Sequence, residues 1–268
     1  MKKVGLCLTG GGAKGAYQIG ALEALNELGL YDQFVSFSGT SIGAANVSVL
    51  ASKSIDAVKK VWMNLPDNAL VSEKPVMSLI WEEGLKTIEK GIYSMDTFEK
   101  VMMSQIDYQE LKRKEVYVTV SEVGQADRSL LEIFTSSYEH YIKKNGKAVY
   151  VPLHNLDQAT IMNAVKASCS IPIVFPPVIS DNKKYYDGGL FDNTPVIPLI
   201  EAGCTEIYII DIAWIKQPQN LQKKYPDIKF HVIKPTKSLG SILDFSIEHA
   251  KVIYEQGYND ALAIFKDN

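Results

Sequence analysis

The stretch Gly39-Thr40-Ser41-Ile42-Gly43 decides how the rest of the sequence is interpreted, because a serine stands between two glycines at a change of pattern. The apolar run Phe34-Val35-Ser36-Phe37 precedes it, and the small residues Ala44-Ala45-Asn46-Val47 follow it. Strand, sharp turn and helix in that order are typical of a nucleophile elbow, whose flanking glycines let the turn close tightly. The alternative is an ordinary strand-to-helix turn in which Ser41 caps the helix.

A glycine-rich segment, Gly10-Gly11-Gly12-Ala13-Lys14-Gly15, lies between an expected strand at 4–8 and an expected helix that ends near Gly29. Consecutive glycines before a helix direct several backbone N–H groups into one small volume, which binds negative charge. In an acyl hydrolase that volume would be an oxyanion hole. Lys14 opposes the dipole of the helix, so it either supports the anion or is a solvated surface lysine.

The same glycines also match the dinucleotide-binding pattern G-x-G-x-x-G, with Asp32 as a candidate ribose-binding acid. That acid belongs at the end of the second strand, whereas Asp32 precedes the second expected strand, which leads directly into Ser41. The order therefore favours the hydrolase over a dinucleotide-binding enzyme. A glycine-rich turn required only for close packing is the third interpretation.

The third motif is Tyr185-Tyr186-Asp187-Gly188-Gly189, an acid between two aromatic residues and two glycines. Asp-Gly can itself be a hairpin turn, but Asp181-Asn182-Lys183-Lys184 just upstream is the better candidate for that turn. Asp187 would then end the second strand of the hairpin. Catalytic groups of α/β sheets gather at strand ends, so Asp187 is a candidate catalytic acid.

In this order the three motifs resemble those of the patatin-like phospholipases, a family of lipid acyl hydrolases. The segment Ala167-Ser168-Cys169-Ser170-Ile171-Pro172, followed by Phe175-Pro176-Pro177, is similar to the stretch that precedes the family's catalytic aspartate. The resemblance covers about residues 4–215. It implies a three-layer α/β/α fold with a central, mostly parallel sheet, and a fatty-acyl ester of a lipid as substrate.

The resemblance also implies a catalytic dyad, with Ser41 as nucleophile and Asp187 as general base and acid. The residues assigned to the oxyanion hole are Gly10, Gly11, Gly12, Lys14, Gly15 and Ile42. The elbow and turn glycines are Gly39, Gly43, Gly188 and Gly189. The positions of the histidines independently favour a dyad without histidine, because none stands beside a glycine-rich turn. The four histidines are His140, His154, His231 and His249. A Ser–His–Asp triad is thus less favoured, although the sequence leaves it open.

The composition is that of an ordinary globular enzyme. The 268 residues are 46% hydrophobic and 22% charged, enough for one sizeable α/β domain. A net charge of -3 favours neither nucleic acid nor anionic membranes as a partner. Three cysteines form no metal pattern and predict reduced, buried thiols. No cofactor or metal is expected. The apolar run at the N-terminus is cut short by glycines and no stretch reaches about 20 apolar residues, so we expect a cytoplasmic protein.

We expect one domain over residues 1–268, with the motifs within about 4–215 and a helical C-terminal segment over about 238–266. Expected strands are 4–8, 34–38, 116–120, 130–135, 206–212 and 229–233, with a hairpin around Asp181. The principal expected helices span about 15–28, 42–52, 54–63, 96–105, 158–167 and 195–202. The irregular segment 65–92 could be an apolar lid over the substrate, or a helix packed on the core, which is favoured.

The expected partners are a lipid or small ester substrate and, transiently, a membrane surface; the oligomeric state is not determined. Two other function classes stay open. One is the dinucleotide-binding enzyme, and the other is a catalytically inactive module that binds a lipid or a protein partner. Transfer of the acyl group to an alcohol other than water is open too.

Overall fold

The computed structural model describes residues 2–65, 96–125, 146–172, 174–213 and 220–266. The expected strand at 130–135, His140, and the candidate lid segment beyond Leu65 lie outside these residues.

A mixed, mostly parallel sheet forms the centre of the molecule, with strands in the order β5-β6-β3-β2-β1-β7-β8 and β4 paired with β3. Strands β3, β2, β1, β7 and β8 are parallel to one another, while β4, β6 and β5 add antiparallel pairs. The bounds are β1 Val4–Leu8, β2 Phe34–Thr40, β3 Glu115–Gln125, β4 Gly146–Pro152, β5 Val178–Ser180, β6 Lys183–Asp187, β7 Glu206–Ile210 and β8 Lys229–Ile233. The predicted strands within the described residues are confirmed, and β4 was not anticipated.

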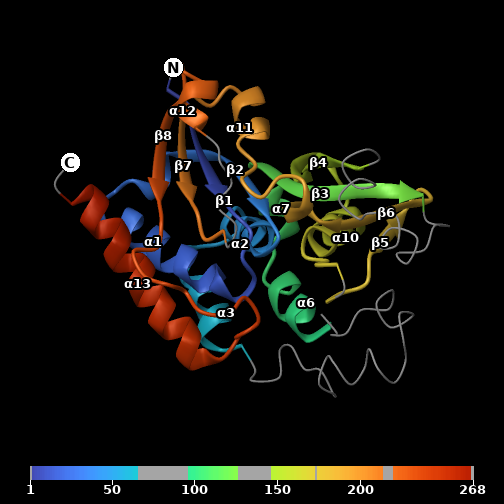
Figure 1. Ribbon diagram of the computed structural model, residues 1–268, viewed down its shortest axis with the longest axis horizontal. Coiled ribbons are helices and arrows are strands. Elements are labelled where there is room, and N and C mark those ends of the chain that lie inside the picture. Colours follow the sequence, from blue (N-terminus) through green and yellow to red (C-terminus); the bar gives the residue numbers. More distant parts are fainter. Residues whose placement is uncertain (1, 66–95, 126–145, 173, 214–219, 267–268) are drawn as a thin grey trace.

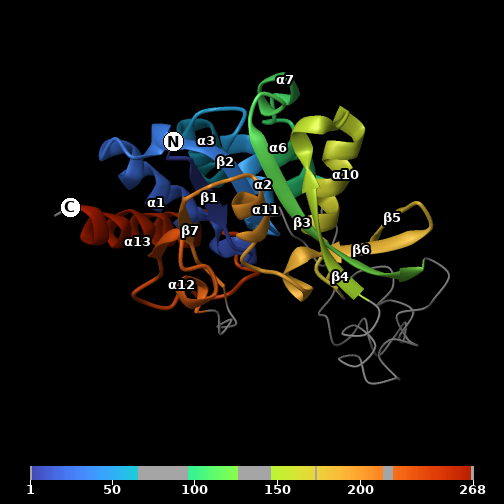
Figure 2. The same cartoon turned by 90° about the horizontal axis from the view of Figure 1, so that it is seen from above.

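The β5–β6 hairpin turns at Asp181 and Asn182, which have φ of 48° and 59°. Residues of this type tolerate the left-handed region, as the two central positions of a tight hairpin turn require. Asp187 therefore ends the second strand of a hairpin, as predicted. The hairpin lies at the opposite end of the molecule from the C-terminal helix in both views (Figures 1 and 2).

Helices cover both faces of the sheet. The α-helices are α1 Gly15–Glu27, α2 Ile42–Leu50, α3 Ile55–Met63, α6 Asp96–Met103, α7 Tyr108–Leu111, α10 Gln158–Ser168, α11 Ile197–Glu201, α12 Leu221–Lys224 and α13 Ile247–Phe265. Short 3-10 helices are η1 Gly12–Lys14, η2 Tyr31–Gln33, η3 Leu153–Asn155 and η4 Gly188–Leu190. On β1, Leu6 and Leu8 join a large apolar cluster with residues of α1, α2 and α13, whereas Cys7 joins a separate cluster with Leu199 of α11. Because strand side chains alternate between faces, these clusters are the two cores of the predicted three-layer fold.

Helix α13 is packed closely against α1, as Figure 1 shows at the lower left. A Cβ on Gly20 of α1 would lie 1.9 Å from the carbonyl oxygen of Tyr254, so only glycine allows this approach. The buried Tyr17 hydroxyl donates to Asp260 of α13 at 3.0 Å. The element that follows the glycine-rich segment is thereby fixed to the C-terminal helix.

The expectation that the C-terminal segment is helical from about residue 238 is wrong at its beginning. Helix α13 starts at Ile247, because the Ser246 hydroxyl accepts the N–H of His249 and caps the first turn. Upstream, Gly240 has a φ of 71°, which a helix cannot contain. Ile242 and Phe245 therefore lie in a loop ahead of the helix.

The sheet register brings the motif-bearing segments together. The glycine-rich segment follows β1, and Ser41 follows β2, so both lie at the carboxyl edge of neighbouring parallel strands. Thr40 is paired with Thr119 of β3, and the next β3 residue, Val120, is paired with Asp187. Because neighbouring strands are about 4.8 Å apart, Asp187 lies about two strand spacings from the elbow.

Candidate active site

Ser41 has the strained backbone of a nucleophile elbow. Its φ is 56° and its ψ is -127°, a region that residues other than glycine rarely occupy. The flanking glycines are required sterically: a Cβ on Gly39 would lie 2.4 Å from the Gly43 carbonyl oxygen, and a Cβ on Gly43 would lie 2.3 Å from that of Leu8. The chain therefore turns from β2 into α2 within a space that admits no side chain at either flank.

Residues at the end of α10 hold the elbow in this conformation. The N–H of Ser41 donates to the hydroxyl of Ser168 at 2.9 Å, and the thiol of Cys169 donates to the carbonyl oxygen of Ser41 at 3.2 Å. Both side chains are buried. Sequence reasoning assigned no role to either residue, although both lie in the Ala167–Pro172 stretch that carries part of the family resemblance.

Asp187 is buried at the end of β6, and its main chain is tied to the same α10 terminus, since its N–H donates to the Ser170 carbonyl at 2.9 Å. Its Oδ1 accepts the N–H of Gly189 at 2.8 Å. Its Oδ2 is buried and has no hydrogen bond of normal geometry to any described residue. Burial raises the pKa of this carboxyl group to about 6, opposed by the Ser41 hydroxyl and the Gly189 N–H, which favour the charged form.

The glycine-rich segment has some backbone N–H groups bonded and others available. The Gly10 N–H donates to Asn193 Oδ1 at 3.1 Å, and Asn193 Nδ2 donates back to the Gly10 carbonyl at 3.2 Å. The Lys14 N–H donates to the Gly11 carbonyl, and the Ala13 N–H donates to the Ile242 carbonyl. No described residue accepts a hydrogen bond from the N–H of Gly11, Gly12 or Ile42.

Asn193 was missed by sequence reasoning. It follows the Asp-Gly-Gly turn by a few residues, and no local pattern indicates that its amide reaches a loop 183 positions earlier in the chain. Its two reciprocal bonds fix the start of the glycine-rich segment against the turn that carries Asp187. Asn193 is therefore a positioning residue for the segment.

Lys14 and Gly15, predicted to belong to the oxyanion hole, lie where η1 ends and α1 begins. Lys14 is only 7% exposed, so the solvated interpretation is wrong, and burial lowers the pKa of its ammonium group. No ion pair joins it to the residues that the structure describes. A Cβ on Gly15 would meet Ile42 Cγ1 at 2.5 Å, so this glycine permits close packing of α1 on α2.

A cavity of about 410 Å³ contains the predicted dyad residues together. Ser41, Asp187, Gly189 and Asn193 line it with Gly10, Gly11 and Gly12, and its apolar wall consists of Ile171, Pro172, Leu190 and Ile242. Of the predicted site residues, Lys14, Gly15, Ile42, Gly39, Gly43 and Gly188 do not line it. A serine, a carboxyl group and the loop residues Gly11 and Gly12 thus share one pocket with an apolar wall.

The described histidines are engaged elsewhere. His154 stacks edge-on against Tyr117, His231 contacts Glu206, and His249 contacts the loop ahead of α13. None of the three lines the cavity. Asp32 is exposed in η2, at the amino end of β2, whereas the glycine-rich segment lies at the carboxyl edge of the sheet. The arrangement required for a dinucleotide ribose is therefore not formed by Asp32.

Two further features are absent from the described ranges, a metal-binding cluster and a membrane-spanning helix. No group of three or more His, Cys, Asp or Glu side chains there could hold a metal ion. Among the helices described, none combines the length and the apolar character needed to cross a membrane.

Residues 6–200 match the family model for the patatin-like phospholipase. The chain belongs to the patatin-like phospholipase family. Curated relatives include the probable lipid hydrolase 463L of Invertebrate iridescent virus 6, which is 22% identical over 98% of this chain and 89% of its own length. Lysophospholipase NTE1 of Eremothecium gossypii is 27% identical over 78% of this chain but only 12% of its own length. Family membership makes the chain an ester hydrolase of the lipid acyl hydrolase type.

Solved structures show the same patatin-like fold. VipD from Legionella pneumophila superposes with a TM-score of 0.56 at 15% identity, covering 100% of this chain and 67% of that chain. Human GIVD cytosolic phospholipase A2 gives a TM-score of 0.50 at 11% identity, covering 99% of this chain and 59% of its own. The predicted fold class is thus confirmed, as is the family resemblance.

Proposed function

We propose that this protein hydrolyses fatty-acyl esters of lipids with Ser41 as nucleophile and Asp187 as general base and acid. The observation that carries the proposal is a buried carboxylate with a pKa of about 6 in the same cavity as a serine at a strained elbow. A base of that strength is ionised at neutral pH, yet basic enough to accept the serine proton. Its Oδ2, which has no hydrogen-bond partner among the described residues, supplies the acceptor.

In the acylation step, Asp187 takes the hydroxyl proton while Ser41 Oγ attacks the ester carbonyl carbon. The negative charge that develops on the carbonyl oxygen is stabilised by the available N–H groups of Gly11, Gly12 and Ile42. The tetrahedral intermediate collapses, the C–O bond to the alcohol breaks, and Asp187 returns the proton to the departing alkoxide. Water deprotonated by the same carboxylate then attacks the acyl-serine ester, releasing the fatty acid and restoring the hydroxyl.

The substrate class follows from the wall of the cavity and from the family. Ile171, Pro172, Leu190 and Ile242 give an acyl chain an apolar surface. Relatives named as a lipid hydrolase and a lysophospholipase support a lipid ester. A Ser–Asp pair is favoured over a triad because none of the described histidines lines the cavity.

The experiment combines activity on an ester series with mass spectrometry after a serine-reactive fluorophosphonate. We expect the adduct on Ser41, and we expect Ser41→Ala and Asp187→Asn each to lower kcat by a factor of at least about 1000. Ser48→Ala is the matched control, because Ser48 is buried in α2 and bonded to the Ala44 carbonyl, away from the cavity. Full activity in Asp187→Asn, or an adduct elsewhere, would contradict the dyad.

The pH profile gives a second readout. Because Asp187 must be ionised to act as a base and its pKa is about 6, kcat/KM should fall tenfold per pH unit below that value. A profile flat down to pH 4.5 on a non-ionising ester would contradict a catalytic role for this carboxylate. An unmodified, inactive protein would favour the binding-module interpretation.

A further inference from the structure

The loop ahead of α13 lies over the glycine-rich segment. The carbonyl oxygen of Ile242 accepts the Ala13 N–H at 2.8 Å, and a Cβ on Gly12 would lie 2.2 Å from the same oxygen. The side chain of Ile242 lines the candidate active-site cavity. Thus one residue touches both the loop that carries the available amides and the pocket. It lies outside residues 6–200, the range matched by the family model.

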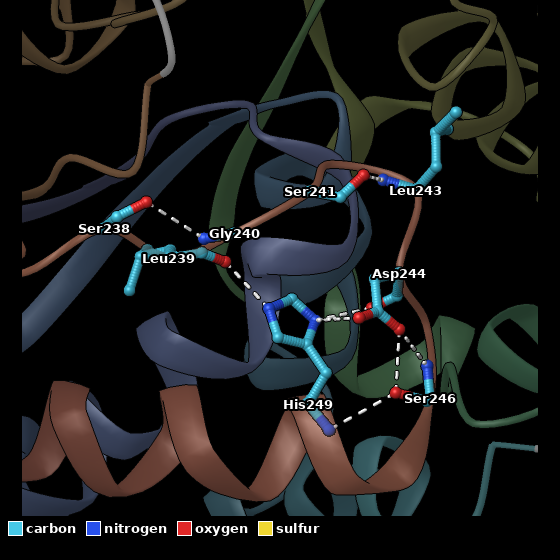
Figure 3. A network of polar contacts seen from close by, with 8 residues as sticks. All are labelled: Ser238, Leu239, Gly240, Ser241, Leu243, Asp244, Ser246 and His249. Carbon is cyan, nitrogen blue, oxygen red and sulfur yellow. Dashed lines mark hydrogen bonds and ion pairs between the residues drawn. The ribbon is translucent and has the colours of Figure 1, made fainter.

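Side chains spaced along one face of helix α13 hold this loop by hydrogen bonds. Asp260 accepts the N–H and the hydroxyl of Thr236, and Gln256 donates to the Lys237 carbonyl at 3.0 Å. His249 contacts the loop at two places. Its Nε2 lies 2.7 Å from the Leu239 carbonyl oxygen, and its Nδ1 lies 2.6 Å from the Asp244 carbonyl oxygen (Figure 3). The two carbonyls stand on either side of Ile242 in the chain.

The ring of His249 bridges two backbone carbonyl oxygens, one at each end of the loop. A carbonyl oxygen accepts hydrogen bonds and a ring N–H donates them, so the imidazole ring can join the two ends of the loop. The carboxylate Oδ2 of Asp244 lies 3.9 Å from Nδ1 of the same ring. Glycine at position 240 lets the loop approach the ring closely, because its φ is 71° and a Cβ there would meet Nε2 of His249 at 3.2 Å.

We propose that residues Leu239–Asp244 complete the active site, with Ile242 limiting the acyl-binding end of the cavity and His249 acting as the positioning residue that keeps the loop in place. The Ile242 carbonyl orients the peptide at Ala13, and with it the preceding N–H of Gly12. His249 touches no reacting atom and acts through Ile242. This inference extends the proposed function from the family motifs to the C-terminal part of the chain.

The first test measures hydrogen exchange of the glycine-rich segment in the full chain, with no substrate. In His249→Ala we expect the Ala13 amide to exchange at least about tenfold faster, because its acceptor is no longer held. Val252→Ala is the matched control, since Val252 is on the same helix as His249 but is 66% exposed and outside the cavity lining. Unchanged exchange in a folded His249→Ala protein would overturn the positioning role.

The second test measures kinetics on a series of esters that differ only in acyl length. Through misplacement of the amides, His249→Ala should lower kcat by about 10- to 100-fold with a smaller change in KM. Ile242→Ala keeps the backbone acceptor and removes side-chain volume from the cavity wall, so it should change the long-to-short ratio of kcat/KM by about tenfold. Ile242→Trp should shift the ratio in the opposite direction.

These readouts separate the two proposals. Exchange at Ala13 needs no activity, so it tests the loop whether or not Ser41 is the nucleophile. A wild-type protein inactive on every ester would contradict the proposed function alone. Activity that depends on Ser41, with a ratio unchanged in both Ile242 variants, would overturn the specificity role and leave the proposed function standing. If His249→Ala does not fold, the Ile242 variants carry the test.

Discussion

The turn that carries Ser41 and the turn that carries Asp187 are held in different ways. At Ser41 the free-energy cost is backbone strain, since tight contacts at Gly39 and Gly43 impose a φ of 56° on the residue between them. At Asp187 the backbone is ordinary and the free-energy cost lies in the side chain. Its carboxyl group has a raised pKa and is buried, and one of its oxygens has no hydrogen-bond partner among the described residues. Backbone strain is the special feature of Ser41, whereas burial away from water makes the Asp187 carboxylate more basic.

The largest effect should come from breaking the steric arrangement at the elbow with Gly43→Ala. The new Cβ would lie 2.3 Å from the Leu8 carbonyl oxygen, so β1 and α2 would have to separate. We expect a loss of about 4 kcal/mol or more in the free energy of unfolding, measured by urea titration.

Gly29→Ala is the matched control for that variant. Gly29 has a φ of 69°, but a Cβ added there would have no neighbouring atom within 4 Å, so alanine meets only the conformational cost of about 1–2 kcal/mol. Equal losses in the two variants would show that the close approach at Gly43 contributes nothing beyond backbone preference.

The second effect concerns the buried carboxyl group of Asp187. Replacing it should raise the free energy of unfolding, whereas Gly43→Ala should lower it. The pKa of Asp187 is about 6 in the folded protein, against about 3.9 in an unfolded chain. Stability is therefore lost as the pH rises between these values, and about 3 kcal/mol is missing at pH 7.5. Asp187→Asn removes that charge and keeps an oxygen for the Gly189 N–H, so it should stabilise the fold by about 1–3 kcal/mol at pH 7.5.

Two observations sharpen this prediction. The gain in the free energy of unfolding should disappear at pH 4, where the wild-type carboxyl group is protonated in the native state. Asp157→Asn should show no such gain, because contacts with Thr160 lower the pKa of the exposed Asp157 carboxyl group instead of raising it. Destabilisation by Asp187→Asn at pH 7.5 would mean that further contacts compensate the buried carboxylate.

What the sequence could and could not predict follows from the distances along the chain over which residues interact. The elbow and the Asp-Gly-Gly turn were recognisable because glycines within a few residues of Ser41 and Asp187 determine the local backbone. Ser168 acts on Ser41 from 127 positions away, and no local pattern indicates such a pair. The start of α13 was misplaced because apolar Ile242 and Phe245 extend the helical spacing into a loop whose conformation depends on Gly240 and His249.

The third effect tests how the strained elbow is supported, through Ser168→Ala. The Ser41 N–H would lose its acceptor in a buried environment, which costs about 1–3 kcal/mol. The proposed nucleophile would also lose its orientation, which should lower kcat by about 10- to 100-fold. The control is Ser170→Ala, because the Ser170 hydroxyl bonds only the Lys166 carbonyl in the described structure, while its own carbonyl still holds Asp187. Similar losses in both variants would contradict a specific role for Ser168.

The smallest effect should come from Cys169→Ala, on the other side of the same peptide. The thiol is a weak donor to the Ser41 carbonyl, and that oxygen also accepts the N–H groups of Ala44 and Ala45 at 2.9 and 3.2 Å. The N–H of Ser41 has no such substitute, and a buried N–H without a partner is rarer and costlier than a carbonyl that loses one of several. We therefore expect Cys169→Ala to cost less than about 1 kcal/mol and to change kcat less than about threefold. If urea titration and ester kinetics gave it an effect as large as that of Ser168→Ala, the elbow would be supported by packing of the α10 terminus as a whole and not by one hydrogen bond.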